Sequence, residues 1–135
     1  MQKATFSLVN YLFDKVLIDL TNHSHDDLHV DFHTSGIFDS SLSKYDLQFK
    51  VKVSNNQTSK VFAEISCKGE FDFKNIAALE EIPDYFYRNS MAILFPYVRA
   101  YLSLVTTQAN VPGIILPTLN LSNLEAELKK NTTQI

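Results

Sequence analysis

The sequence predicts an α+β fold: an antiparallel sheet of about four strands, followed by a long amphipathic helix and shorter helices. Three observations predict this class. Between Leu47 and Phe73, apolar and polar residues alternate with a period of two, as in strands with one buried face. From Met91 to Val105, apolar residues recur every three or four positions, as on one face of a helix. Strand patterns come first and helix patterns follow, which is typical of α+β domains.

The first strand is predicted from Thr5 to Leu20 and is apolar on both faces. Simple alternation places one set of side chains on one side (Phe6, Leu8, Leu12, Val16, Ile18 and Leu20) and a second set on the other (Val9, Tyr11, Phe13 and Leu17). A strand of this kind needs cover on both faces, from helices, a second subunit or a bound polypeptide. A further short strand is predicted at residues 29–33.

The next two strands form a predicted hairpin. Apolar residues alternate with polar ones from Leu47 to Val53, and after an Asn-rich turn at 55–59 a longer alternating run covers residues 61–73. Two such runs joined by about five residues are typical of an antiparallel hairpin.

Helices are predicted from Asn75 onward. A short helix around residues 76–86 is broken near Pro83, and the long helix follows it. Pro96 either sits in the first turn of the long helix or kinks it, because proline has no N–H to donate. The apolar stripe of the long helix is wider than one face, which indicates contacts beyond those with the sheet.

The C-terminal part begins with a predicted long ordered loop at residues 110–120, which contains three helix breakers. Ser122 is the predicted N-cap of a last helix that ends at Lys130. Residues 131–135 are predicted to fray.

Composition limits the function classes. The 135 residues are 45% hydrophobic and 20% charged, as in a soluble globular protein, and we predict a single domain over residues 1–135. A net charge of -3 without a basic cluster argues against a nucleic-acid partner. No apolar stretch reaches the ~20 residues that span a bilayer, and the N-terminus does not resemble a signal peptide. The single cysteine cannot form an internal disulfide, so we expect a cytoplasmic protein.

The four histidines all lie between His23 and His33, alongside three aspartates. On a strand, His29, Asp31 and His33 would point the same way, and imidazole with carboxylate is a ligand set for zinc or nickel. One interpretation is therefore a metal-binding enzyme or sensor. The other is that these side chains form the solvated face of an edge strand, with Val30 in the core. We favour the second, with no metal site and no cofactor.

No catalytic constellation is evident. Cys67 lies on the apolar side of its strand, where a thiol is a small buried hydrophobe rather than a nucleophile. With three glycines the chain has no Gly-rich phosphate loop, and its paired carboxylates are adjacent residues that point in different directions. The sequence predicts a protein that is not an enzyme.

Two motifs carry a family resemblance. Residues 93–99 read ILFPYVR, and residues 111–121 read VPGIILPTLNL. These segments resemble the SecB family of bacterial export chaperones, whose members typically carry ILFPYAR and then FPxLNLxPxNF. The second proline is displaced by one place, to Pro117. The similarity extends from Phe6 to Leu128 and includes the strand, hairpin and helix order.

The resemblance implies an ATP-independent molecular chaperone, a holdase that keeps precursor or other non-native polypeptides unfolded for export. It implies a homotetramer, a dimer of dimers, with apolar client-binding grooves. We assign the groove to a set of apolar residues: Phe6, Leu8, Tyr11, Phe49, Phe86, Ile115, Leu116 and Leu119. We assign the oligomer interface to Ala63, Ile65, Cys67 and Phe95.

The sequence matches the family less well at the positions that dock the partner protein to which clients pass. In the family, an acidic patch on the outer sheet face docks the motor SecA, and the matching positions here are Asp19, Phe62 and Glu64. Lys15 stands where the family commonly has an acid, and the C-terminal residues are not acidic. A lost charge weakens association at a steering patch. The alternative function is therefore a SecB-like chaperone dedicated to the antitoxin of a toxin–antitoxin system.

Overall fold

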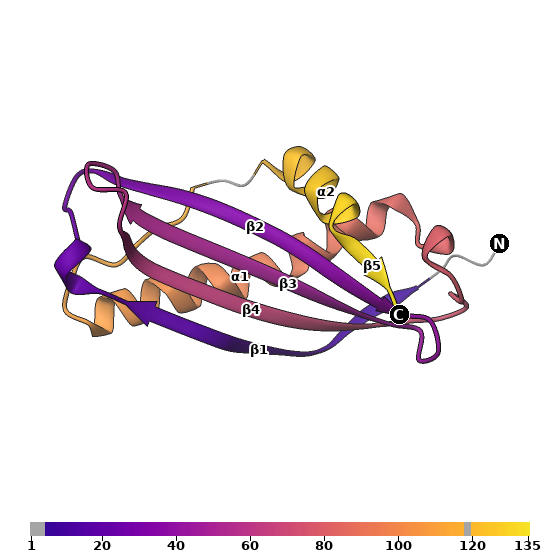
Figure 1. Cartoon of the computed structure of the whole chain (residues 1–135). Coiled ribbons are helices and arrows are strands. Elements are labelled where there is room, and N and C mark those ends of the chain that lie inside the picture. The colour runs from indigo at the N-terminus through magenta and orange to yellow at the C-terminus, as the bar shows by residue number, and fades with distance from the viewer. Residues whose placement is uncertain (1–4, 118–119) are drawn as a thin grey trace.

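The described part of the chain forms one five-stranded sheet and two α-helices (Figure 1). The computed structural model describes residues 5–117 and 120–135. The elements, in chain order, are β1 (Phe6–Ile18), a 3-10 turn (Leu20–Asn22), β2 (Leu28–Asp39), β3 (Lys44–Asn55), β4 (Val61–Phe73), a second 3-10 turn (Leu79–Glu81), α1 (Asp84–Gln108), α2 (Leu121–Lys130) and β5 (Thr132–Gln134).

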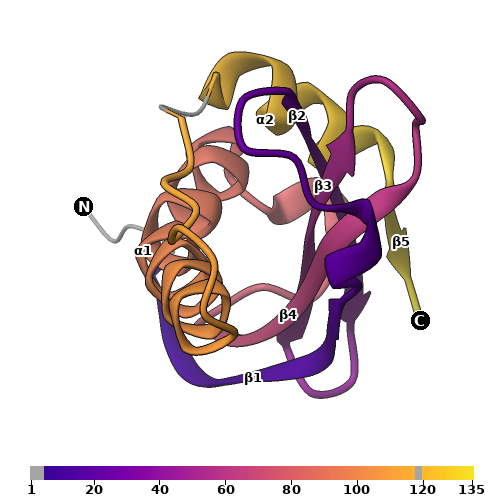
Figure 2. The ribbon, with the colours of Figure 1, turned by 90° about the vertical axis from the view of Figure 1, so that its left-hand side faces the viewer.

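The strands are ordered β1-β4-β3-β2-β5 across the sheet. The three long pairings are antiparallel, and the short pairing of β2 with β5 is parallel. α1 lies across one face of the sheet, and α2 lies beside β2 (Figure 2). The prediction of an α+β fold with an antiparallel sheet, a long helix and a shorter helix is confirmed.

The core lies between the hairpin β3–β4 and α1. Leu47, Phe49 and Val51 pair with Gly69, Cys67 and Ile65 across the hairpin, so all six face the same side. Their helix partners include Leu94, Val98 and Leu102, which are fully buried at single-turn spacing on α1. Each fully buried aliphatic side chain of this kind stabilises the fold by about 1.5–3 kcal/mol. The period-two and helical patterns in the sequence therefore meet in one interface.

Strand β1 departs from the simple alternation that the sequence suggests. Register shifts occur between Leu8 and Asn10 and between Phe13 and Lys15. Because each bulge adds one residue to the strand, it moves the following side chains to the other face. The side chains opposite the helix-facing residues of β4 are therefore Phe6, Leu8, Tyr11, Phe13, Val16 and Ile18. The predicted division of β1 is therefore wrong for Tyr11, Leu12 and Phe13, between the two shifts. It is right for Val16 and Ile18, which the second shift returns to the face of Phe6 and Leu8.

The C-terminus is an ordered strand rather than a frayed end. β5 pairs with Gly36 to Phe38 of β2, and the backbone N–H of Ile135 donates to Phe38 O at 2.8 Å. The buried hydroxyls of Tyr45 and Thr132 lie 2.5 Å apart. Gly36 permits this contact, because a Cβ at that position would overlap the ring of Tyr45. The sequence prediction missed β5, since three residues carry no periodicity of their own.

The helices differ from the prediction at their ends. α1 begins directly after Pro83 and continues through Pro96 for 25 residues. The short helix predicted around residues 76–86 is instead the 3-10 turn Leu79–Glu81, followed by the first residues of α1. α2 begins two residues earlier than predicted, because Asn120 rather than Ser122 caps it, accepting a hydrogen bond from Asn123 N at 3.4 Å. Within residues 5–117 and 120–135, no helix is long and apolar enough to cross a membrane.

Candidate binding groove

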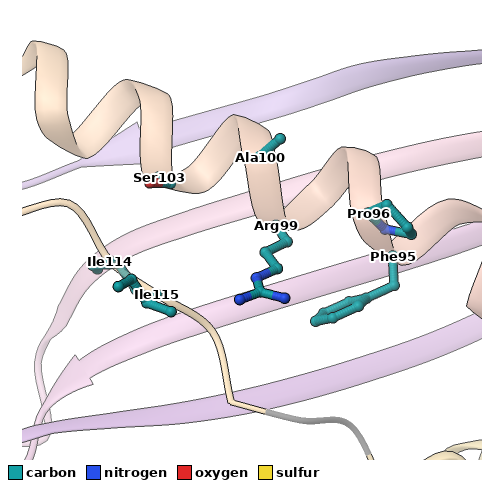
Figure 3. Close-up of a pocket in the computed structure, with 7 residues that line it drawn as sticks. All are labelled: Phe95, Pro96, Arg99, Ala100, Ser103, Ile114 and Ile115. Atoms are coloured by element: carbon teal, nitrogen blue, oxygen red, sulfur yellow. The ribbon is translucent and has the colours of Figure 1, made fainter.

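A hollow runs between α1 and the loop that follows it, and we call it the α1–loop groove (Figure 3). It consists of two cavities of about 400 and 290 Å³. The lining of the first is Phe95, Pro96, Arg99, Ala100, Ser103, Ile114 and Ile115, and that of the second is Ala92, Phe95, Pro96, Arg99, Leu116, Pro117 and Leu121. The two cavities share three residues, so they form one elongated site.

The loop side of the groove is tied to α1. Asn110, with a φ of 66°, ends the helix in the left-handed region, which asparagine tolerates better than most residues. The buried hydroxyl of Thr106 accepts a hydrogen bond from Ile114 N at 3.0 Å and donates one to Leu102 O at 2.8 Å. A Cβ at Gly113 would come within 2.5 Å of Thr107 Oγ1, so glycine allows a close approach there. These contacts hold the loop beside the helix.

The groove is mostly apolar and open to solvent. Phe95 is half-buried and packs against the core. Its ring centroid lies 6.2 Å from that of Phe32 and 6.1 Å from that of Phe49. Ile115 is 76% exposed, an unusual state for a branched aliphatic side chain. Covering such a surface with an apolar group is favourable, because it removes apolar area from water. The site can therefore bind apolar side chains.

The structure brings together only part of the predicted groove set. Ile115 and Leu116 line the α1–loop groove, and Phe95, predicted as an oligomer contact, lines it as well. Leu119 lies outside the described residues. The sequence analysis did not assign Pro96, Arg99 and Ile114 to the groove, although all three belong to the two motifs quoted above.

The other predicted groove residues lie elsewhere. Phe49 and Phe86 are fully buried in the core, so they present no surface to a partner. Phe6, Leu8 and Tyr11 lie on the helix-facing side of β1, at the sheet edge. Phe6 lines a separate cavity of about 470 Å³ together with the polar side chains of Lys44 and Asp72, among others.

Three of the residues assigned to an oligomer interface are core residues of the single chain. Ala63, Ile65 and Cys67 are fully buried beneath α1. An oligomer contact through the described surface therefore has to use other side chains. The pKa of the Cys67 thiol is raised to about 12, mainly by burial and to a smaller extent by the charge of Asp14. This cysteine therefore stays protonated and unreactive.

The predicted motor-docking residues do not form an open acidic patch. Glu64 Oε2 lies 2.5 Å from Lys15 Nζ, and Oε1 lies 3.7 Å from Lys52 Nζ. Phe62 is fully buried, with the ring of His23 4.9 Å away. The Asp19 carboxylate accepts hydrogen bonds from Thr21 and caps the first 3-10 turn. The negative charge at this position of the sheet is therefore largely compensated.

Glu64 gives a testable pH dependence. The hydrogen bond from Lys15 holds the pKa of Glu64 below its usual value against the opposing effect of burial, and the charges of Lys52 and Lys50 lower it further. Because the folded-state pKa is depressed, the carboxylate stabilises the fold above its unfolded-state pKa, and this contribution is lost as pH falls through the folded-state pKa.

We therefore expect Glu64→Gln to lower the free energy of unfolding by about 1 kcal/mol at pH 7. The difference from the unaltered protein should shrink as the pH falls below 4.5, the ordinary value for this carboxyl. Urea unfolding of the Glu64→Gln variant and of the unaltered protein over a series of pH values measures this difference in the free energy of unfolding. A difference that stays constant with pH would contradict the ion-pair account.

The histidine segment matches the solvated-face interpretation in its orientation. Val30 and Phe32 face the helix side of β2, and His29, Asp31 and His33 point to the other face. His29 Nε2 lies 2.9 Å from Asp31 Oδ1, and His33 Nδ1 lies 3.8 Å from Glu127 Oε1. Among the described residues, no group of three or more His, Cys, Asp or Glu side chains is placed to hold a metal ion.

Comparison with known proteins adds three findings. Residues 13–131 match the family described as SecB, "Preprotein translocase subunit SecB". The chain is 37% identical over 79 residues to the "Uncharacterized protein MJ0357" of Methanocaldococcus jannaschii; the match covers 56% of this chain and about half of that relative's length.

The structure resembles that of the Mycobacterium tuberculosis Rv1957 SecB-like chaperone, solved in complex with a ChAD peptide from the Rv1956 HigA1 antitoxin. The TM-score is 0.68 with 16% sequence identity, over 84% of this chain and 90% of that one. At this identity the likeness shows a shared fold.

Proposed function

Because this chain belongs to the SecB family, whose chaperones are not enzymes, we propose that it is an ATP-independent holdase. It binds an extended apolar segment of a non-native polypeptide in the α1–loop groove and so keeps that polypeptide from aggregating. One observation carries the proposal: the exposed Ile115 stands beside two apolar cavities that share the wall formed by Phe95 and Pro96.

The binding energy comes from apolar burial, at roughly 25 cal/mol for each Å² removed from water. This term has no direction, so a groove that relies on it accepts many apolar sequences. Binding needs no nucleotide, because the burial of apolar surface itself supplies the binding free energy. The buried, single Cys67 fits a cytoplasmic site of action.

The second candidate function has a narrower client, the antitoxin of a toxin–antitoxin system. Two observations support it. The fold is similar to that of a SecB-like chaperone solved with an antitoxin peptide. In addition, Lys15 and Lys52 compensate the charge of Glu64, on the face that the family resemblance assigns to SecA. We therefore rank a dedicated antitoxin client alongside export clients.

We further propose that the chain assembles as a homotetramer, a dimer of dimers. Apolar side chains remain exposed where β1 and α1 meet. Tyr11 stacks on Tyr97 with ring centroids 4.3 Å apart, and the two side chains are still about two-fifths exposed. Val16 of β1 and Leu104 of α1 are exposed as well. A patch of this kind on a single chain is typical of an interface between subunits.

The test is aggregation of a chemically unfolded reporter protein, diluted with and without this chain and without nucleotide, while the mass of the chain is measured by light scattering. A holdase should suppress aggregation near stoichiometric amounts. A parallel assay follows the proteolysis of an antitoxin encoded beside this protein. Protection of the antitoxin without suppression of reporter aggregation would support the dedicated function. Failure in both assays would refute the chaperone proposal.

A further inference from the structure

Among the described residues that line the mostly apolar α1–loop groove, Arg99 is the one charged side chain. Arg99 lines both cavities, and its guanidinium lies between Phe95 and the loop residue Ile115 (Figure 3). The side chain is exposed, and among the described residues it has no hydrogen-bond or ion-pair partner. This cation is therefore available to a bound molecule.

The other arginine of α1 shows the contrast. Arg88 donates to Glu125 Oε2 from Nε at 3.2 Å and to Ser122 Oγ from Nη2 at 3.2 Å, so it joins α1 to α2. Lys129 of α2 is likewise paired with Asp84 at 2.8 Å. The contacts between the helices thus use these cations to hold the fold together. Arg99 contributes to none of them.

The surroundings of Arg99 favour one kind of ligand. A guanidinium presents a planar set of donors that matches the two oxygens of a carboxylate. When a bound segment covers the groove, the neighbouring Phe95, Pro96 and Ile115 exclude water from the guanidinium. An ion pair is stronger under such cover than on an open surface.

We propose that Arg99 binds the side-chain carboxylate of an aspartate or glutamate in the polypeptide segment that occupies the groove. This rests on the holdase function proposed above and specifies its client. Because Arg99 belongs to both cavities, the carboxylate lies between two apolar side chains, one in each cavity. In an extended chain, alternate residues face the same way. The preferred segment is therefore apolar, any residue, acidic, any residue, apolar.

The experiment compares three fluorescein-labelled peptides that differ only at the central position of Leu-Ser-Asp-Ser-Phe, which carries Asp, Asn or Lys. Fluorescence anisotropy gives the Kd of each peptide for the full chain and for three variants. Arg99→Gln removes the guanidinium, and Arg99→Lys keeps its charge but not its planar donors. Lys50→Gln is the matched control, because it removes one exposed positive charge from the outer sheet face.

We expect the full chain to bind the Asp peptide about tenfold more tightly than the Asn peptide, and the Lys peptide more weakly still. Arg99→Gln should abolish this preference, Arg99→Lys should reduce it, and Lys50→Gln should leave it unchanged. Added salt should weaken the Asp peptide more than the Asn peptide.

Three results would overturn the inference. If the Asp and Asn peptides bind equally while Ile115→Ser weakens both, the inference is wrong and the groove function stands. If Ile115→Ser changes the Kd of neither peptide, the peptides do not bind in the α1–loop groove and the proposed function fails as well. If the preference for Asp persists in Arg99→Gln, a different cation is responsible.

Discussion

Replacing Phe86 with alanine should lower the free energy of unfolding by about 3–5 kcal/mol, because it removes the centre of the aromatic core. Phe86 is fully buried near the start of α1. Its ring centroid lies 4.7 Å from those of Tyr45 and Phe73 and 4.8 Å from that of Phe6. The ring therefore joins α1 to β1, β3 and β4, and its close-packed neighbours would fill the space that alanine leaves only in part.

The measurement is urea unfolding followed by circular dichroism. Phe86→Leu, which keeps more of the volume, should cost about 1–2 kcal/mol and remains measurable if the alanine variant does not fold. Leu42→Ala is the control, because Leu42 is 62% exposed in the β2–β3 turn and its truncation should stay within about 0.5 kcal/mol. If Phe86→Ala were as stable as this control but failed to bind clients, Phe86 would belong to the groove, as the sequence alone suggested.

The sequence predicted the layers of the fold well because periodicity reports burial directly. The alternation in β3 and β4 and the three- and four-residue steps in α1 each mark one buried face. It failed where tertiary contacts decide the structure. The bulges of β1 near Val9 and Asp14 leave no mark in the pattern, so Tyr11, Leu12 and Phe13, which lie between them, were assigned to the wrong face. Strand β5 is held in place by the hydrogen bond between the hydroxyls of Thr132 and Tyr45, which joins segments that are distant in the sequence.

The binding groove was predicted in part for the same reason. Ile115 and Leu116 were recognised through the family motif in which they lie. Phe49 and Phe86 were assigned to the groove as members of a set of apolar residues. The structure buries both side chains. Phe86 makes edge-to-face contacts with Tyr45 and Phe71, and Phe49 makes one with Phe32. The role of Phe95 depends on where the loop after α1 runs, and no local pattern specifies that path.

The prediction that bears most directly on function concerns Ile115. Replacing it with serine should weaken the binding of an unfolded client about 10- to 100-fold, the equivalent of about 1.5–3 kcal/mol of lost apolar burial. The fold should not change, because the side chain is 76% exposed and supports little of the core. Ile115→Leu, which keeps the apolar volume, should bind nearly as well as the unaltered chain.

Binding is measured by fluorescence anisotropy with a labelled, permanently unfolded polypeptide, alongside thermal melting and light scattering of each variant. Leu42→Ser is the matched control: it removes a comparably exposed aliphatic side chain at a site distant from Ile115 in the sequence and outside the lining of the α1–loop groove. It should leave both affinity and assembly unchanged. If Ile115→Ser and Leu42→Ser bind the client equally well, clients do not use the α1–loop groove. Chaperone activity would then have to come from another apolar surface, and the exposed contact of Tyr11 with Tyr97 would be the next to test.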